Sequence, residues 1–292
     1  KVDVSKVTHV LYAFANIKDG QCVLGDSYAD IEKTFPGMTY KDPRDMSPGN
    51  HNGNIGWFAT PGKYARAINP NLKFIISIGG WSWSGAFSEV ARTQATREKF
   101  VNSCVQFMLD YNFDGIDVDW EFPVTGGLPG NVYDPSDRDT YTKLMVLFRS
   151  TLDKLQPAKH YDLSIASSQN PKYLRDNYDL NALMKPLDYV NIMTYDYNGC
   201  FFSKSGHQTP LYCNPQDPGF ANGFCVEKSV DVFLNAGVPS CKLNVGVAFY
   251  GRAAGKVPAE GTKDTAADWL NKDWNTQSCP AGRYEGGIDD YK

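Results

Sequence analysis

The segment that decides the fold is Phe113-Asp-Gly-Ile-Asp-Val-Asp-Trp-Glu-Phe-Pro123. Its acids Asp117, Asp119 and Glu121 alternate with apolar residues, which is the period of two expected for a β-strand. The three acids therefore share one face of the strand, and the apolar residues share the other. We expect Pro123 to end the strand just after Glu121.

Three acids on one buried strand face cannot all ionise cheaply. Neighbours on that face lie about 6–7 Å apart, so repulsion and desolvation raise at least one pKa and keep one acid protonated near neutral pH. The titration belongs to the set rather than to single residues. Glu121 is the candidate proton donor, because it has the longest side chain and comes last. Asp114 has the opposite parity and needs a partner of its own.

Two other interpretations of the segment are open. A surface strand would also carry acids on its wet face, but the aromatic residues around this one favour burial. A calcium or magnesium loop would also cluster acids, but the spacing lacks the EF-hand pattern and its central glycine.

Composition limits the function classes. The 292 residues suffice for one α/β barrel or two smaller domains. The formal net charge of −4 and the absence of basic runs argue against a nucleic-acid partner and favour a neutral polymer. Aromatic side chains are plentiful and suit the apolar faces of sugar rings. No stretch reaches the roughly 18–20 apolar residues of a membrane span.

Cysteines and histidines predict disulfides rather than a metal centre. The seven cysteines contain no C-x-x-C pair and the four histidines are scattered, so we expect no metal and no cofactor. Cys200, Cys213 and Cys225 crowd a loop rich in Gly, Pro and Asn, which predicts disulfides and an extracellular, secreted protein. Cys104 falls within a helical pattern and is expected to be a small buried apolar residue.

The rest of the chain alternates strands with helices, which predicts an α/β fold with a parallel sheet and polar residues at the strand ends. Besides the segment above, strands are expected at 7–17, 72–79, 161–167, 187–194 and 243–249. Helices are expected at 61–68, 96–111 with Thr96 as N-cap, 137–155 and 226–236. Residues 18–60 are expected to form a long loop that walls a cleft.

Residues 114–121 resemble the D-x-x-D-x-D-x-E signature of the family 18 glycoside hydrolases, the chitinases. Three further motifs are similar to S-x-G-G, M-x-Y-D and F-Y-G-R of that family, at residues 77–80, 193–196 and 249–252. The resemblance implies a TIM (β/α)8 barrel. Residues 1–253 would be its catalytic core, and residues 254–292 would begin a small α+β insertion of the bacterial type. Only six of eight strands are predicted, so the first and last strands are expected to be missing from this chain.

The resemblance also implies a mechanism and a set of site residues. Glu121 would protonate the bond between N-acetylglucosamine units, and the substrate's own acetamido oxygen would attack to give an oxazolinium ion, with overall retention. Asp119 would orient the acetamido group, Asp117 would share a proton with Asp119, and Tyr195 would bond the acetamido oxygen. The implied substrate-binding residues are Tyr12, Phe14, Gly79, Gly80, Trp81, Phe122, Met193, Asp196, Tyr250 and Arg252. The implied partner is chitin or a chitooligosaccharide, bound by a monomer.

Two alternative functions are also compatible with these motifs. A catalytically inactive, chitin-binding lectin on the same barrel typically lacks the proton-donating glutamate, whereas Glu121 is present. An endo-β-N-acetylglucosaminidase that trims N-glycans shares the acidic motif. Chitin and a glycoprotein substrate separate these activities.

Overall fold

The computed structural model describes residues 3–42, 47, 50–155, 159–253, 270–273 and 288–290. The chain forms two compact units, residues 1–166 with 182–189, and residues 167–181 with 190–292. The strands are β1 (His9–Lys18), β2 (Gln21–Val23), β3 (Lys73–Gly79), β4 (Gly115–Asp119), β5 (Asp162–Ser167), β6 (Tyr189–Ile192), β7 (Leu243–Val245), β8 (Tyr250–Arg252) and β9 (Ile288–Asp290). The helices are α1 (Gly53–Ala59), α2 (Tyr64–Ile68), α3 (Gly80–Trp83), α4 (Phe87–Arg92), α5 (Gln94–Asp110), α6 (Asp137–Leu152), α7 (Pro171–Asp176), α8 (Leu180–Leu183) and α9 (Val226–Asn235).

The sheet of the first unit runs in the order β2-β1-β3-β4-β5. Strands β1, β3, β4 and β5 are parallel, and only β2 pairs antiparallel, as a hairpin partner of β1. The register sets Asp117 opposite Ser77 on β3 and opposite Ser164 on β5. The carboxyl ends of β3 and β4 therefore meet at one edge of the sheet, where Gly79 pairs with Asp119. This confirms the parallel sheet predicted from the sequence.

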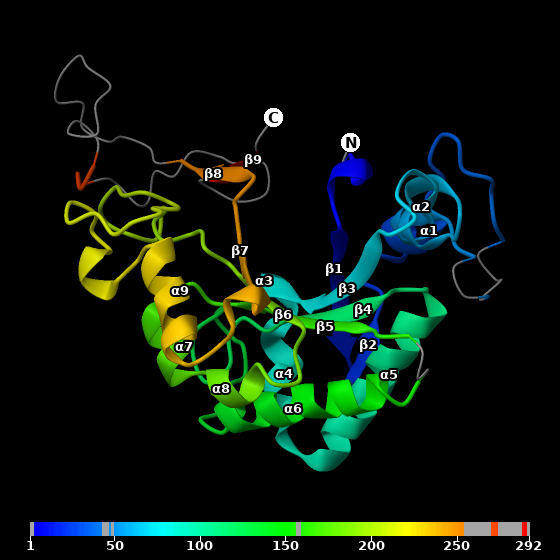
Figure 1. Cartoon of the computed structure of the whole chain (residues 1–292), viewed down its shortest axis with the longest axis horizontal. Coiled ribbons are helices and arrows are strands. Elements are labelled where there is room, and N and C mark those ends of the chain that lie inside the picture. The colour runs from blue at the N-terminus through cyan, green and yellow to red at the C-terminus, as the bar shows by residue number, and fades with distance from the viewer. Residues whose placement is uncertain are drawn as a thin grey trace. The chain divides into compact units, whose positions relative to one another are not determined.

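The core of the first unit lies on the apolar face of this sheet. Phe74, Ile76, Ile116 and Val118 share that parity and are buried. Helices α4, α5 and α6 lie along this side of the sheet (Figure 1), and their rings interlock, for example Phe100 edge-on to Phe148 at 6.0 Å. Burying each such side chain is worth about 1.5–3 kcal/mol, so the core fixes which face the acids of β4 must occupy.

Helix α5 begins earlier than expected. Thr93, not Thr96, is its N-cap, and Thr96 is the third helical residue of a capping box in which each side chain accepts the other's backbone N–H. Two threonines spaced by three residues favour this reciprocal arrangement. The expected loop 18–60 also contains regular structure, because β2 and α1 fall inside it.

In the second unit, β6 and β7 pair in parallel, with Val190 opposite Leu243. The strand expected at 243–249 ends at Val245, and Tyr250–Arg252 forms a separate strand, β8, which pairs antiparallel with β9. Most of the insertion expected at 254–292 lies outside the described residues. Within the described part of the chain, every helix is too short or too polar to cross a membrane.

Candidate active site

The acids of β4 lie as their parity predicts. All five residues of the strand are buried, and Asp117 and Asp119 point away from the face that carries Ile116 and Val118. Burial of two carboxyl groups on one strand face is costly unless each is hydrogen-bonded or protonated. The two acids meet this requirement in different ways.

Asp117 is held by hydroxyl donors from both neighbouring strands. Ser77 Oγ donates to Asp117 Oδ2 at 2.7 Å, and Ser164 Oγ donates to Asp117 Oδ1 at 2.6 Å. Hydrogen bonds donated to a carboxylate stabilise its charged form. The geometry therefore fixes Asp117 as an oriented acceptor at the centre of the sheet.

Asp119 is the acid whose protonation the site controls. Burial raises the pKa of Asp119 well above its usual value, and the nearby charges of Glu121 and Asp117 raise it further. Its Oδ1 is buried and has no hydrogen-bond partner among the described residues. Burial and the neighbouring acids therefore favour the protonated form of Asp119 over its charged form.

Glu121 lies two residues beyond the end of β4 rather than within the strand, which corrects the expected boundary. Its backbone N–H donates to Ser84 Oγ at 2.9 Å, and Ser84 Oγ donates in turn to the carbonyls of Gly80 and Asp119. This hydroxyl therefore ties the turn after β3 to the turn after β4. The half-buried Glu121 is held at the carboxyl ends of the strands, where parallel α/β barrels place their chemistry.

Asp114 has the separate partners that its parity requires. Arg66 Nη2 lies 2.7 Å from Asp114 Oδ2, Lys159 Nζ lies 3.3 Å from Oδ1, and the N–H of Phe74 donates to Oδ2. Burial would raise the pKa of Asp114, but the bonds from Phe74 and Arg66 and the charge of Lys159 outweigh it, and the pKa is lowered. Asp114 therefore belongs to a structural ion-pair network and is separate from the acids Asp117, Asp119 and Glu121.

The paired glycines turn the chain sharply at the edge of the sheet. Gly79 has a φ of +102° and Gly80 a φ of +72°, which L side chains rarely adopt. A Cβ on Gly79 would lie 2.4 Å from the Phe87 ring, and one on Gly80 would lie 2.6 Å from the Phe14 ring. Glycine is therefore required at both positions because any larger residue would clash with the rings of Phe87 and Phe14.

Tyr12 and Phe14, both expected to bind substrate, lie in different surroundings on β1. A register shift between Ala13 and Ala15 leaves Phe14 outside the regular pairing and sets its ring against Gly80. Tyr12 pairs with Ile76 and so shares the face opposite the acids, where its hydroxyl donates to Asp30 Oδ1. The structure therefore assigns Tyr12 to support of the sheet, and the strand irregularity separates it from Phe14.

The aromatic residues beside the acids differ in exposure. Trp81, in α3, keeps 45% of its surface exposed, whereas Trp120 is buried and stacks on Phe87. Phe122 is half-buried directly after Glu121. Trp81 and Phe122 are thus accessible rings next to the turns that hold the acids.

The second unit brings four of the other predicted residues together. Arg252 Nε donates to Asp196 Oδ1 at 2.7 Å, and the rings of Tyr195 and Tyr250 meet edge to face at 5.9 Å. Burial raises the pKa of Tyr250, and its hydrogen bond to Asp196 raises it further, so the phenol stays a donor. Met193 is half-buried beside them, and its N–H bonds the carbonyl of Ser167.

Sequence reasoning missed the three serines that organise the acids. Ser77 stood in a quoted motif, but its bond to Asp117 needs the register of β3 against β4. Ser164 requires the pairing of β4 with β5, and Ser84 gives no signal in the sequence at all. These contacts depend on pairing between distant strands.

Two of the cysteine predictions are confirmed in the described residues. Cys213 and Cys225 form a disulfide that closes the Gly- and Pro-rich loop. Cys104 is a fully buried free thiol beside Cys22, and burial raises its pKa well above the usual value. Cys279 lies outside the described residues.

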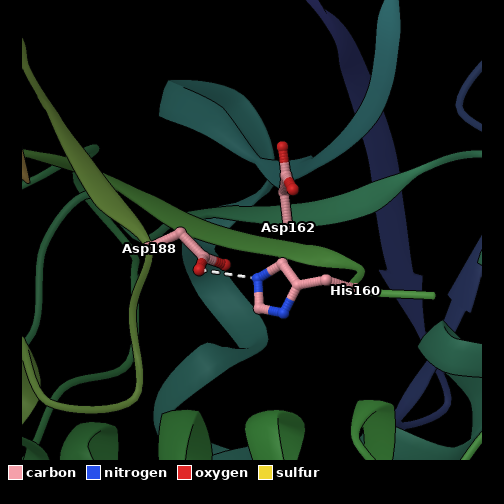
Figure 2. Close-up of side chains that lie close together, drawn as sticks. All are labelled: His160, Asp162 and Asp188. Atoms are coloured by element: carbon pink, nitrogen blue, oxygen red, sulfur yellow. Dashed lines mark hydrogen bonds and ion pairs between the residues drawn. The ribbon is translucent and has the colours of Figure 1, made fainter. Parts of the chain in front are cut away.

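One cluster in the described residues has the spacing of metal ligands, although the sequence predicted none. Ligand atoms of His160, Asp162 and Asp188 lie within 4.8 Å of one another. Figure 2 shows the imidazole of His160 bonded to Asp188, with Nε2 2.7 Å from Oδ1. Arg149 lies 3.4 Å from Asp188 and His9 lies 3.1 Å from Asp162. These basic groups already balance both carboxylates, so the cluster is best explained as an ion-pair network at the amino ends of the strands.

Comparison with known proteins shows the family. Residues 1–291 match the family described as glycosyl hydrolases family 18. This chain belongs to that family. The fold is accordingly the α/β TIM barrel of its catalytic domains, as the sequence predicted.

The family 18 chain is similar to several chitinases. It is 40% identical over 288 residues to chitinase A1 of Niallia circulans, covering 86% of this chain and 40% of that protein. It is 37% identical to chitinase 1 of Aphanocladium album, covering 99% of this chain and 62% of that protein. Among solved structures, chitinase ChiA74 from Bacillus thuringiensis superposes with a TM-score of 0.84 at 32% identity, over 99% of this chain and 52% of that one. The chain thus spans about half the length of the relatives it matches.

Proposed function

We propose that this chain is the catalytic part of a chitinase, which hydrolyses the β-1,4 linkages between N-acetylglucosamine units of chitin with retention of configuration. The observation that carries the proposal is the buried Asp119, whose pKa is raised by burial and by Glu121. A buried acid with a raised pKa and an unpartnered oxygen, beside a second, more accessible acid, fits a reaction that needs a proton donor and a separate acceptor for an amide N–H.

In this reaction Glu121 acts first as an acid and then as a base. The Glu121 carboxyl group gives its proton to the glycosidic oxygen, the bond from that oxygen to C1 breaks, and the substrate's acetamido oxygen bonds to C1. Positive charge then spreads over the oxazolinium ring. Water, deprotonated by the Glu121 carboxylate, attacks C1 and reopens the ring, which restores the proton to Glu121.

Asp119 and Asp117 support the charge that develops. Asp119 Oδ1 accepts the acetamido N–H, which is the role its unpartnered state leaves available. The proton of Asp119 shifts toward Asp117 as the oxazolinium ion forms, so that negative charge increases next to the ring nitrogen. Ser77 and Ser164 keep Asp117 oriented for this exchange.

The remaining roles follow from the family's motifs. Tyr195 bonds the acetamido oxygen, Asp196 and Arg252 bond sugar hydroxyls, and Met193 and Tyr250 line the sugar. Phe14, Gly79, Gly80, Trp81 and Phe122 form the part of the sugar site next to the acids. The net charge of −4 suits a neutral polymer. Secretion and a monomeric state complete the proposal, and the disulfide supports secretion.

The test is release of reducing ends from chitin oligomers by the wild type and Glu121→Gln. A general acid contributes about 10²–10⁴-fold, so Glu121→Gln should lose at least about 100-fold in turnover. Glu89→Gln, which removes an exposed carboxylate from α4, is the matched control and should keep wild-type turnover. A wild type that binds chitin without cleaving it, or a Glu121→Gln enzyme with unchanged turnover, would overturn the proposal.

A further inference from the structure

The backbone of Glu121 lies beyond the last paired residues of its strand. The pairing of β4 with β5 ends at Val118, and its pairing with β3 ends at Asp119. The N–H and C=O of Glu121 therefore need partners other than strand neighbours, since backbone groups shielded from water rarely stay unpaired. In the structure both partners are side chains, those of Ser84 and Asn131.

Ser84 holds the N–H side of Glu121. Its hydroxyl oxygen accepts the Glu121 N–H at 2.9 Å, and the same hydroxyl lies 2.8 Å from the carbonyl oxygen of Gly80 and 3.2 Å from that of Asp119. The bond to Gly80, four residues earlier in the chain, uses the hydroxyl proton and leaves a lone pair for the N–H of Glu121. Ser84 is 1% exposed, so this acceptor is shielded from water.

Asn131 holds the carbonyl side of the same residue. Its Nδ2 donates to the Glu121 carbonyl oxygen at 3.1 Å. Gly127 lies against that oxygen as well, because a Cβ at this position would be only 2.1 Å away from it. Gly127 has a φ of +77°, which glycine adopts without strain. The carbonyl of Glu121 is thus confined by one side chain and one glycine of the following loop.

The loop that presents this amide donor is itself held in place. The N–H of Val132 donates to the carbonyl of Gly85, the residue directly after the serine. Asp137, at the start of α6, is buried and accepts the N–H groups of Val124 and Asp134 through Oδ2, at 3.3 and 2.8 Å. The serine and the amide therefore come from segments that are bonded to each other and to α6.

We propose that Ser84 and Asn131 are positioning residues, which hold the backbone of Glu121 from both sides and so fix where its carboxyl group lies against the bond to be cleaved. The inference rests on the proposed function and adds two residues to it. A glutamate side chain starts from its Cα, so its carboxyl group is displaced whenever the backbone moves. A displacement of about 1 Å at a reacting group can cost about 100-fold in rate.

The test measures kcat and KM of Ser84→Ala and Asn131→Ala on a soluble fluorogenic chitooligosaccharide. Each variant should lose about 10- to 100-fold in kcat, because the proton donor is misplaced, and should keep KM within about twofold, because neither side chain is assigned to the substrate. Thermal unfolding is recorded for each variant, and kcat is compared at a temperature at which all of them are folded. Asn131→Ala changes a half-buried loop residue, so it tests the proposal even if Ser84→Ala fails to fold.

The chain offers matched controls with the same kinds of hydrogen bond elsewhere. Ser103 of α5 accepts the N–H of Cys22 at 3.0 Å and donates to the carbonyl of Phe100 at 2.7 Å. Asn69 Nδ2 donates to the carbonyl of Val7 at 2.9 Å. Ser103→Ala and Asn69→Ala remove comparable bonds between side chain and backbone. Both should keep the wild-type kcat even where they lower Tm.

The double variant Ser84→Ala with Asn131→Ala asks whether the two side chains act on one group. If either loss already releases the backbone of Glu121, the double variant should lose less than the product of the two single losses. Losses that multiply in full would overturn the proposal, as would an unchanged kcat in both single variants. An equal loss of kcat in the controls, or a loss that appears only as a higher KM, would overturn it too.

Amide hydrogen exchange separates this proposal from the proposed function, because it needs no turnover. The N–H of Glu121, followed by NMR, should exchange slowly in the wild type and about 2- to 12-fold faster in Ser84→Ala and in Asn131→Ala, the factor expected for one hydrogen bond. It should be unchanged in Ser103→Ala. Equal exchange in all variants would overturn the proposal. A wild type that protects this N–H but cleaves no chitooligosaccharide would instead overturn the chitinase assignment.

Discussion

Replacing Asp117 with Asn removes one negative charge from the buried acids and keeps the shape of the side chain. Alternate residues on a strand face lie about 6.6 Å apart. At an effective dielectric constant of about 20, two unit charges at that distance interact by about 2.5 kcal/mol, or about two pKa units. The charge of Asp117 is one of the causes that raise the pKa of Asp119, after burial and Glu121. Asp117→Asn should therefore lower that pKa by about 1–2 units, since relaxation and solvent reduce the full Coulomb value.

The pH profile of kcat/KM on a soluble fluorogenic chitooligosaccharide measures this change. Its basic limb reports loss of the last proton from the coupled acids of the free enzyme. Removing a neighbouring charge makes that proton easier to lose, so the basic limb should move about 1–2 units toward lower pH. Asp139→Asn, which removes an exposed carboxylate from α6, is the control and should leave the limb in place. A limb that stays within a few tenths of a unit, or moves toward higher pH, would refute the coupling of Asp117 with Asp119.

Two further predictions concern the scaffold. Arg66→Met should destabilise the fold by about 3–5 kcal/mol, because it leaves the buried Asp114 without its closest cation. The pKa of Asp114 is lowered in the folded state, so its contribution is present above the unfolded pKa of about 4 and is lost as pH falls through the folded value. Urea unfolding at pH 7 and pH 3 should show that the free energy of unfolding depends less on pH in Arg66→Met than in the wild type. The exposed Arg138→Met is the control and should behave as wild type. If Arg66→Met lowers the free energy of unfolding by less than about 1 kcal/mol, the ion-pair role is contradicted. Gly79→Ala should lower the free energy of unfolding by about 1–3 kcal/mol more than Gly37→Ala does. Both positions have a positive φ, so they share the backbone strain. Only at Gly79 would the Cβ contact other atoms, with Phe87 at 2.4 Å and the Asp119 carbonyl at 2.5 Å. Equal falls in Tm for the two variants would show that crowding at Gly79 is unimportant.

The sequence predicted the parts of the fold that local pattern controls. Alternation along residues 115–119 placed Asp117 and Asp119 on one buried face, and the opposite parity of Asp114 correctly required a separate partner. Both inferences depend only on the geometry of a single strand. The helices with clear apolar periodicity, α5, α6 and α9, were likewise predicted to within a few residues.

Features that depend on pairing or on local irregularity could not be predicted. Tyr12 was grouped with Phe14 in the sugar site, but Tyr12 pairs with Ile76 on the face opposite the acids, and a register shift between Ala13 and Ala15 separates it from Phe14. The serine donors to Asp117 come from two other strands, so only the register of β3, β4 and β5 identifies them. The helices α3 and α4 were missed because, at four and six residues, they are too short to show a helical period.

The stereochemistry of the first product tests the central claim most directly. Proton NMR of chitohexaose hydrolysis in deuterated buffer resolves the two anomers of the new reducing end before they interconvert. A reaction in which Glu121 donates the proton and the acetamido group attacks C1 should give the β anomer first, with the α anomer appearing only at the rate of mutarotation. Initial release of the α anomer, or no cleavage at all, would contradict the account.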